Sequence, residues 1–181
     1  MEKVFKEKNS ELNPAPDLSE LRIVDVGIGE MKVTRDPRAV LVVYGVGSCV
    51  SVCAYDPEVP VAGMAHILLP KSGADDTGRD ARYADVAIPA LVGKMEKKGA
   101  DGRSLVFKIA GGASLVRTNS EEKQKIGARN VREVQRILGE MNARVASKDV
   151  GGNRVRTVRF FVSTGEMVVS NAKRAGEQAK T

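Results

Sequence analysis

The residues in this sequence best suited to covalent chemistry are two cysteines and one histidine. Cys49 and Cys53 are the only cysteines and His66 is the only histidine among the 181 residues. A cysteine thiolate is a strong nucleophile, and a nearby imidazole can remove and return the proton that such a reaction moves. Zinc sites with four cysteine and histidine ligands are excluded because the chain has too few of these residues. We expect neither a metal nor a cofactor.

A predicted β-hairpin brings the histidine to one of these cysteines. If the turn-forming residues Asp56–Val59 make a four-residue loop, Tyr55 pairs with Pro60. Cys49 then lies directly opposite His66, and directly opposed residues have Cβ atoms about 4.5–5.5 Å apart on one face of the sheet. This pairing predicts Cys49 as a nucleophile and His66 as a general base and then acid.

The residues before Cys49 favour a tight turn. Gly45 and Gly47 stand at alternate positions, and Ser48 follows them. Such a turn can direct the backbone N–H groups of Ser48 and Cys49 at a developing oxyanion. A neighbouring imidazolium is expected to lower the pKa of the Cys49 thiol. The alternative, that Cys49 is a small buried hydrophobic residue, stays open here, and for Cys53 we expect that alternative.

The elements that position these residues are read from the apolar pattern. It predicts seven or eight strands, mostly consecutive, and two principal helices. Consecutive strands joined by tight turns give largely antiparallel or mixed sheets. The expected class is therefore α+β, a layered α/β sandwich with two helices packed against the sheets. The expected strands lie within 21–34 and at 40–44, 50–55, 61–68, 105–109, 145–150, 155–162 and 166–169, and the helices at 80–98, which contains Pro89, and 126–141.

Composition bounds the organisation and location of the chain. We expect a flexible N-terminal arm over 1–20, one domain over 21–170 and a flexible basic tail over 171–181. The uncharged run 39–55 is rich in valine and contains glycines, so it favours buried strands over a membrane span. The charged N-terminus lacks the apolar core of a signal peptide, and two cysteines make no disulfide framework. A cytoplasmic location is expected.

The net charge of +6 and pI near 9.4 raise nucleic acid as a partner. Basic residues are mixed with acids, and only Arg154, Arg156 and Arg159 form a local basic strand. The seven aromatic residues make no paired stacking pattern of an RNA-binding sheet. We therefore expect no nucleic-acid partner, whereas an acidic protein surface stays open as a partner.

Several motifs together resemble one known family. Gly45-Val-Gly-Ser-Cys-Val50 followed by His66-Ile-Leu-Leu-Pro70 is similar to the signature of the chemoreceptor glutamine deamidase (CheD) family. Further similar stretches cover about 21–170: Arg82–Pro89, Lys108–Ala113, Ile126–Val131 and the Gly151-Gly152 pair before a basic strand.

The resemblance implies a protein-glutamine deamidase. It implies a cytoplasmic cysteine hydrolase that converts glutamine side chains of methyl-accepting chemotaxis receptors to glutamate through a thioester, in chemotaxis adaptation. It also implies the layered sandwich fold and a CheC-type phosphatase as partner. Cys49 matches the family's nucleophile and His66 its acid/base.

One position departs from the family pattern. The family's third catalytic residue is a threonine six positions before the cysteine, where this chain has Val43. Valine has no hydrogen-bonding group to orient the imidazole. This departure motivates an alternative hypothesis, a non-catalytic adaptor that regulates the phosphatase or receptor. Hydrolysis of receptor methyl esters uses the same chemistry and stays open.

Overall fold

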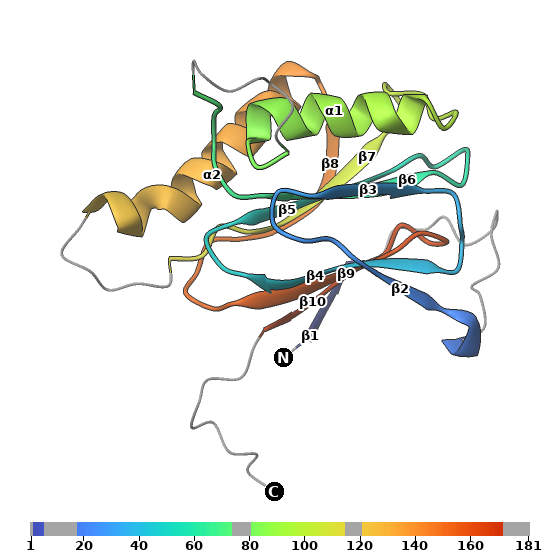
Figure 1. The fold of residues 1–181 in the computed structure, drawn as a ribbon, viewed down its shortest axis with the longest axis horizontal. Helices are drawn as coiled ribbons and strands as arrows, with labels where there is room; N and C mark the ends of the chain where they lie inside the picture. Colours follow the sequence, from blue (N-terminus) through green and yellow to red (C-terminus); the bar gives the residue numbers. More distant parts are fainter. Residues whose placement is uncertain (1, 6–17, 74–80, 115–120, 172–181) are drawn as a thin grey trace, which may run out of the picture.

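Two five-stranded sheets packed face to face, with two helices on one outer face, form the molecule. This computed structural model describes residues 2–5, 18–73, 81–114 and 121–171. Figure 1 shows α1 (Ala84–Glu96) and α2 (Glu121–Glu140) above the sheet that contains β5 and β6. The first sheet has the order β1-β10-β9-β4-β2 and the second the order β3-β6-β5-β7-β8. The expected α+β layered sandwich is confirmed.

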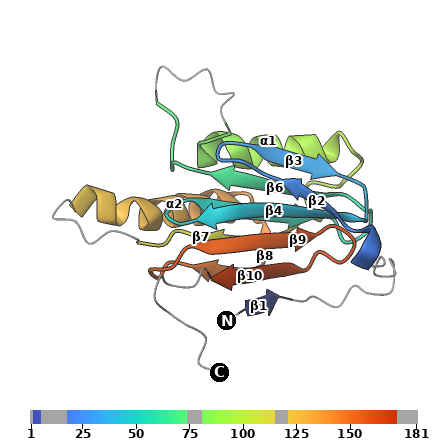
Figure 2. The same ribbon diagram turned by 60° about the horizontal axis from the view of Figure 1, so that its bottom comes forward.

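Strand pairing is mixed, as the sequence predicts. The β2–β4 and β7–β8 pairs are parallel and the other strand pairs described are antiparallel. Figure 2 shows the first sheet with its strands side by side from β2 to β1. The strands are β1 (Glu2–Phe5), β2 (Arg22–Asp25), β3 (Met31–Thr34), β4 (Ala39–Val46), β5 (Val50–Tyr55), β6 (Ala62–Ile67), β7 (Val106–Gly111), β8 (Arg144–Val150), β9 (Arg156–Phe161) and β10 (Met167–Asn171), with a 3₁₀ turn at Leu18–Glu20.

The described residues contain ten strands, more than the seven or eight predicted. The count includes β1, which pairs with β10 although it lies within the expected N-terminal arm. The first helix begins at Ala84, later than predicted, and continues through Pro89. Residue 80, where the first helix is predicted to begin, lies outside the described residues, as do most of the expected arm and the tail 172–181.

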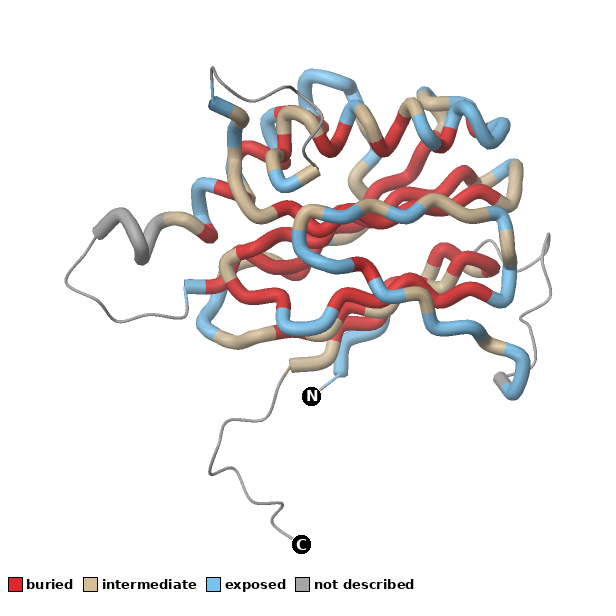
Figure 3. The backbone as a smooth tube through the Cα atoms, viewed as in Figure 1, coloured by how far each residue is buried: buried red, intermediate tan, exposed pale blue. Residues whose placement is uncertain are grey.

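The second sheet is buried on both faces because it lies between the first sheet and the helices. Alternate residues of β5 divide accordingly: Val50, Val52 and Ala54 pack toward the helices, whereas Cys53 and Tyr55 pack between the sheets. Figure 3 shows the buried residues concentrated along the facing strands. The period of two residues thus sets which side chains reach the space between the sheets.

The end of β4 leaves the core just before the predicted turn. Val40–Val43 are at most 1% exposed, as expected for a strand buried on both faces, but Tyr44 is 56% exposed. The expectation that Tyr44 is buried is wrong because the pairing of β4 with β9 shifts between Val43 and Val46, and Gly45 has a φ of 71°. A bulge of this kind redirects a strand end.

Candidate active site

Cys49 lies in the connection between β4 and β5, one residue before β5 begins. The chain turns there through Gly45, whose positive φ suits a glycine. Cys49 packs at the edge of the cluster between the sheets and is 7% exposed, whereas Cys53, in the middle of β5, is completely buried. Cys49 therefore lies in a loop at the end of the sandwich, whereas Cys53 lies inside it.

The hairpin that follows has a different register from the predicted one. Tyr55 pairs with Ala62, not Pro60, and Ser51, not Cys49, lies opposite His66. The four-residue loop is wrong because Pro60 has no N–H to join the ladder. The loop instead closes through the hydrogen bond from Asp56 N–H to the carbonyl of Val61, 3.0 Å long.

The register difference does not separate the two reactive side chains. It equals two residues, so every side chain keeps its face of the sheet. Cys49 and His66 are therefore diagonal neighbours on the face between the sheets, a relation that places Cα atoms about 7–8 Å apart in a regular antiparallel pair.

His66 is oriented by backbone groups of the β2–β3 connection. Its Nδ1 lies 3.4 Å from the carbonyl oxygen of Val26. The main chain of His66 pairs with the same connection, accepting from Gly29 N–H at 2.9 Å and donating to the Glu30 carbonyl at 3.0 Å. Because a carbonyl only accepts, Nδ1 carries the proton and Nε2 is the unprotonated nitrogen.

The unprotonated nitrogen of His66 has the features of a general base. Nε2 of His66 is buried and has no hydrogen-bond partner among the described residues. Buried polar atoms without a partner are uncommon and often mark a functional group. In this tautomer Nε2 can accept a proton from a thiol or a water on the face that Cys49 shares.

Burial shifts the pKa values of both groups toward their neutral forms. Burial raises the pKa of the Cys49 thiol, although its own backbone N–H partly opposes this. Burial lowers the pKa of His66, against the hydrogen bond to Val26. The expected lowering of the thiol pKa by an imidazolium is therefore wrong for the free protein. The resting pair is a thiol and a neutral imidazole, and His66 acts as a base during attack.

The three carbonyls of the Cys49 loop all accept hydrogen bonds from outside the loop. Gly112 N–H donates to Cys49 O and Ala113 N–H to Gly47 O, each at 2.7 Å. The side-chain Nδ2 of Asn130 donates to Ser48 O at 2.9 Å. In a trans peptide the N–H points away from the C=O. Fixing the Gly47 and Ser48 carbonyls therefore directs the Ser48 and Cys49 N–H groups to the opposite side of the loop.

Asn130 also ties the loop to the chain beyond the histidine. It is completely buried, and its Nδ2 donates a second hydrogen bond to Leu68 O at 2.9 Å. A Cβ at Gly127 would stand 2.6 Å from Gly112 O, so only glycine lets α2 approach this closely. The sequence analysis missed the role of Asn130 because α2 meets the loop only in three dimensions. The sequence signal for this contact is the pair Gly127 and Asn130, which stand about one helical turn apart on α2.

The comparisons with known proteins agree with the motifs. The family model described as "CheD chemotactic sensory transduction" matches residues 68–171. The chain belongs to the CheD family. A relative from Archaeoglobus fulgidus, named probable chemoreceptor glutamine deamidase CheD, is 41% identical over 84% of this chain and 94% of its own. One from Thermotoga maritima, named chemoreceptor glutamine deamidase CheD, is 42% identical over 84% and 94%. A solved Neisseria meningitidis structure aligns at 12% identity over 82% of this chain and 74% of its own, with a TM-score of 0.46 that supports no conclusion.

The position at which this chain departs from the CheD pattern is occupied by a packing residue. Val43 is completely buried and pairs with Val158 on β9. Its side chain offers the imidazole no hydrogen bond. The Val26 carbonyl, directly after the parallel neighbour β2, meets Nδ1 of His66 instead. A backbone acceptor thus fixes the tautomer of His66, a role for which the resemblance implies a threonine.

The structure offers no support for a metal site, a membrane span or phosphate binding among the described residues. Within the described ranges no group of three or more His, Cys, Asp or Glu could hold a metal ion. None of the helices described is long and apolar enough to cross a membrane. Arg156, from the basic strand, is buried against Asp149 at 2.9 Å and is therefore unavailable to phosphates.

Proposed function

We propose that this chain converts glutamine side chains of methyl-accepting chemotaxis receptors to glutamate. One observation carries the proposal: the buried, unpartnered Nε2 of His66 lies on the same face as the only cysteine outside the strand interior. The names of the CheD relatives support the reaction and the receptor as substrate. The fixed tautomer of His66 favours this function over a non-catalytic adaptor.

The reaction proceeds in two halves. Nε2 of His66 takes the thiol proton as Cys49 Sγ attacks the carboxamide carbon, and the resulting oxyanion accepts hydrogen bonds from the N–H groups of Ser48 and Cys49. His66 returns the proton to the departing nitrogen, ammonia leaves and a thioester remains. Water, deprotonated by His66, then attacks the thioester, which releases glutamate and restores the thiol.

Mass spectrometry of a receptor cytoplasmic fragment tests this function. Incubation with the protein should add about 1 Da for each glutamine converted, with release of one ammonia molecule. The Cys49→Ala protein should bind the fragment without the mass change. A wild-type protein that binds but never changes the mass would refute the enzyme and favour the adaptor. A fragment with methylated glutamates tests ester hydrolysis in the same assay.

We also propose a CheC-type phosphatase as partner and the cytoplasm as location. Both cysteines are free thiols, which fits a reducing compartment. Size-exclusion chromatography of the two proteins mixed at micromolar concentration should give one complex. Separate elution of the two proteins would refute the partnership without affecting the proposed reaction.

A further inference from the structure

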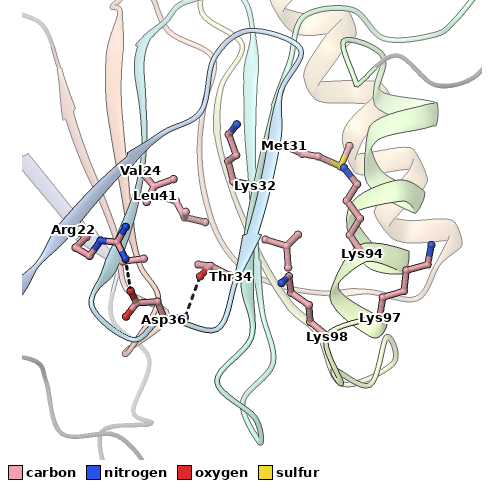
Figure 4. A pocket seen from close by; sticks show the side chains of 12 residues that line it. Arg22, Val24, Met31, Lys32, Thr34, Asp36, Leu41, Lys94, Lys97 and Lys98 are labelled. Carbon is pink, nitrogen blue, oxygen red and sulfur yellow. Dashed lines mark hydrogen bonds and ion pairs between the residues drawn. The ribbon is translucent and has the colours of Figure 1, made fainter.

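A groove runs along one side of the sandwich, where each sheet ends in an edge strand. It has a volume of about 600 Å³ and lies between β2, β3 and the last turns of α1. β2 is an end strand of the first sheet and β3 of the second. Figure 4 shows Arg22 on one side of the groove and Lys94, Lys97 and Lys98, at the C-terminal end of α1, on the other.

The charges that line the groove are almost all positive. Asp36 is the only acidic residue among those that line it, and it is already paired with Arg22 at 3.2 Å and with Arg38. Lys32 is half-exposed and, among the described residues, forms an ion pair only with Glu30, also half-exposed, at 3.3 Å. Such an exposed pair is easily exchanged for another partner. The basic residues of the groove are Arg22, Lys32, Lys94, Lys97 and Lys98.

Three lysines lie at the C-terminal end of α1, Lys94 within the helix and Lys97 and Lys98 directly after it. Lys94, Lys97 and Lys98 are exposed and form no ion pair within the described part of the chain. A cation near a helix C-terminus is favoured by the helix dipole. The dipole does not account for the convergence of these lysines with Arg22 and Lys32, which come from two other elements.

The floor of the groove is apolar. Met31 and Val33 from β3 and Val24 and Leu41 from the first sheet contribute to it. Figure 4 shows Met31 beside Lys94, with Val24 and Leu41 on the side of Arg22. Apolar floor and basic rim together fit a segment with both acidic and apolar side chains, because each kind of side chain then finds its complement.

The groove reaches the strand that pairs with the segment carrying His66. Met31 pairs with Ala65, the residue before His66. At about 3.4 Å per residue, β3 then leads from Met31 to Thr34 over about 10 Å. That length corresponds to about three residues of an extended segment or about seven of a helix. One substrate chain can therefore place a short segment in the groove and a glutamine at Cys49.

We propose that this groove binds an acidic segment of the substrate protein next to the target glutamine, an inference that rests on the proposed function. Acidic side chains several residues from the glutamine along the substrate chain meet Lys94, Lys97 and Lys98. The groove thereby selects which glutamines reach Cys49.

Charge removal in the groove tests this proposal. The groove variant carries Lys94→Gln, Lys97→Gln and Lys98→Gln. The control variant carries Arg144→Gln, Lys148→Gln and Arg154→Gln, on and just after β8 at the opposite edge of the second sheet. With a receptor fragment at low salt, KM of the groove variant should rise about tenfold while kcat stays unchanged, and the control should match wild type.

A second measurement separates the groove from the reaction itself. Peptides with one glutamine, with and without neighbouring glutamates, should differ in KM for wild type but not for the groove variant. The proposal for the groove would be overturned if an active wild-type protein had the same KM for both peptides. It would also be overturned if KM of the control variant rose as much as that of the groove variant. Absence of ammonia release with every substrate would overturn the proposed function instead. Inhibition by a short RNA that disappears in the groove variant would assign the groove to nucleic acid and overturn this proposal.

Discussion

Cys49 and Cys53 lie on the same face of the second sheet, four residues apart, yet they differ in the properties that govern thiol reactivity. Cys53 is completely buried, its sulfur lies 3.8 Å from the Ser51 hydroxyl, and burial raises its pKa to about 12. Cys49 is slightly exposed, with a smaller rise in pKa. The chemistry thus depends on where each cysteine sits in the chain, not on its face of the sheet.

The contrast extends to the backbone around each cysteine. The main chain of Cys53 is paired on both sides, with Met64 of β6 and Lys108 of β7. The carbonyl of Cys49 is bound by Gly112, while its N–H donates to no other residue of the described chain. Strand ends are where N–H groups can be directed at a ligand while the rest of the sheet holds the loop rigid.

The largest expected effect comes from exchanging each cysteine for alanine. Cys49→Ala should lower the rate of receptor deamidation by at least about 10³-fold, because no other nucleophile is available. Cys53→Ala should keep the wild-type rate at a temperature where it is folded. Ammonia release measures both variants. Equal losses in the two variants would show that the two cysteines do not differ in role.

His66→Gln should lower kcat by about 10²- to 10⁴-fold, the usual contribution of a positioned base. Because burial lowers the pKa of His66, the wild-type rate should fall only when the pH drops below the usual histidine range, as the imidazole becomes protonated. The glutamine variant should lack this fall. An acid limb at or above pH 6.5 in the wild-type profile would contradict the burial of a neutral imidazole.

Alkylation compares the two thiols directly. In the folded protein iodoacetamide should modify Cys49 about 10²-fold faster than Cys53, since alkylation requires exposure and the thiolate. Because burial raises the pKa of Cys49, its rate should still increase with pH above 8. Peptide mapping after timed quenching gives both rates. A rate for Cys49 that levels off near neutral pH would instead indicate a thiolate–imidazolium pair.

The sequence predicts the shared face of Cys49 and His66 but not their relative position along it. Alternation of side chains survives a shift of two residues, so the face is correct although the register is not. The loop length depends on Asp56, whose side chain accepts from the N–H groups of Glu58 and Val59 in a turn that residue types alone do not specify.

Contacts between distant segments are the part of the site that sequence reasoning does not reach. The acceptor for His66 is a backbone carbonyl, at Val26, and every residue type has one. Gly111 ends β7 and Gly112 follows it, and the packing of this pair on the Cys49 loop is not predicted from the sequence. A Cβ at Gly111 would stand 2.2 Å from Cys49 O, so glycine is required by a segment more than sixty residues away in the chain.

The smallest expected effect tests how the loop around Cys49 is held. Asn130→Ala removes one donor from the Ser48 carbonyl, while the hydrogen bonds to the Gly47 and Cys49 carbonyls remain. Loss of an oxyanion donor itself costs about 10²- to 10³-fold in kcat. Asn130→Ala only frees the peptide that carries this donor to rotate, so kcat should fall about tenfold with KM nearly unchanged.

Two further readouts distinguish this positioning role from general destabilisation. The acid limb of the pH profile, which reports His66, should not move in Asn130→Ala because the histidine is held by Val26. The alkylation rate of Cys49 should rise as the loop loosens, while that of Cys53 stays low. If Asn130 only stabilised the fold, both cysteines would become more reactive in parallel, and kcat corrected for the folded fraction would equal the wild-type value. An equal rise in the reactivity of Cys49 and Cys53 would thus remove the difference between the loop cysteine and the strand cysteine, on which the proposed chemistry depends.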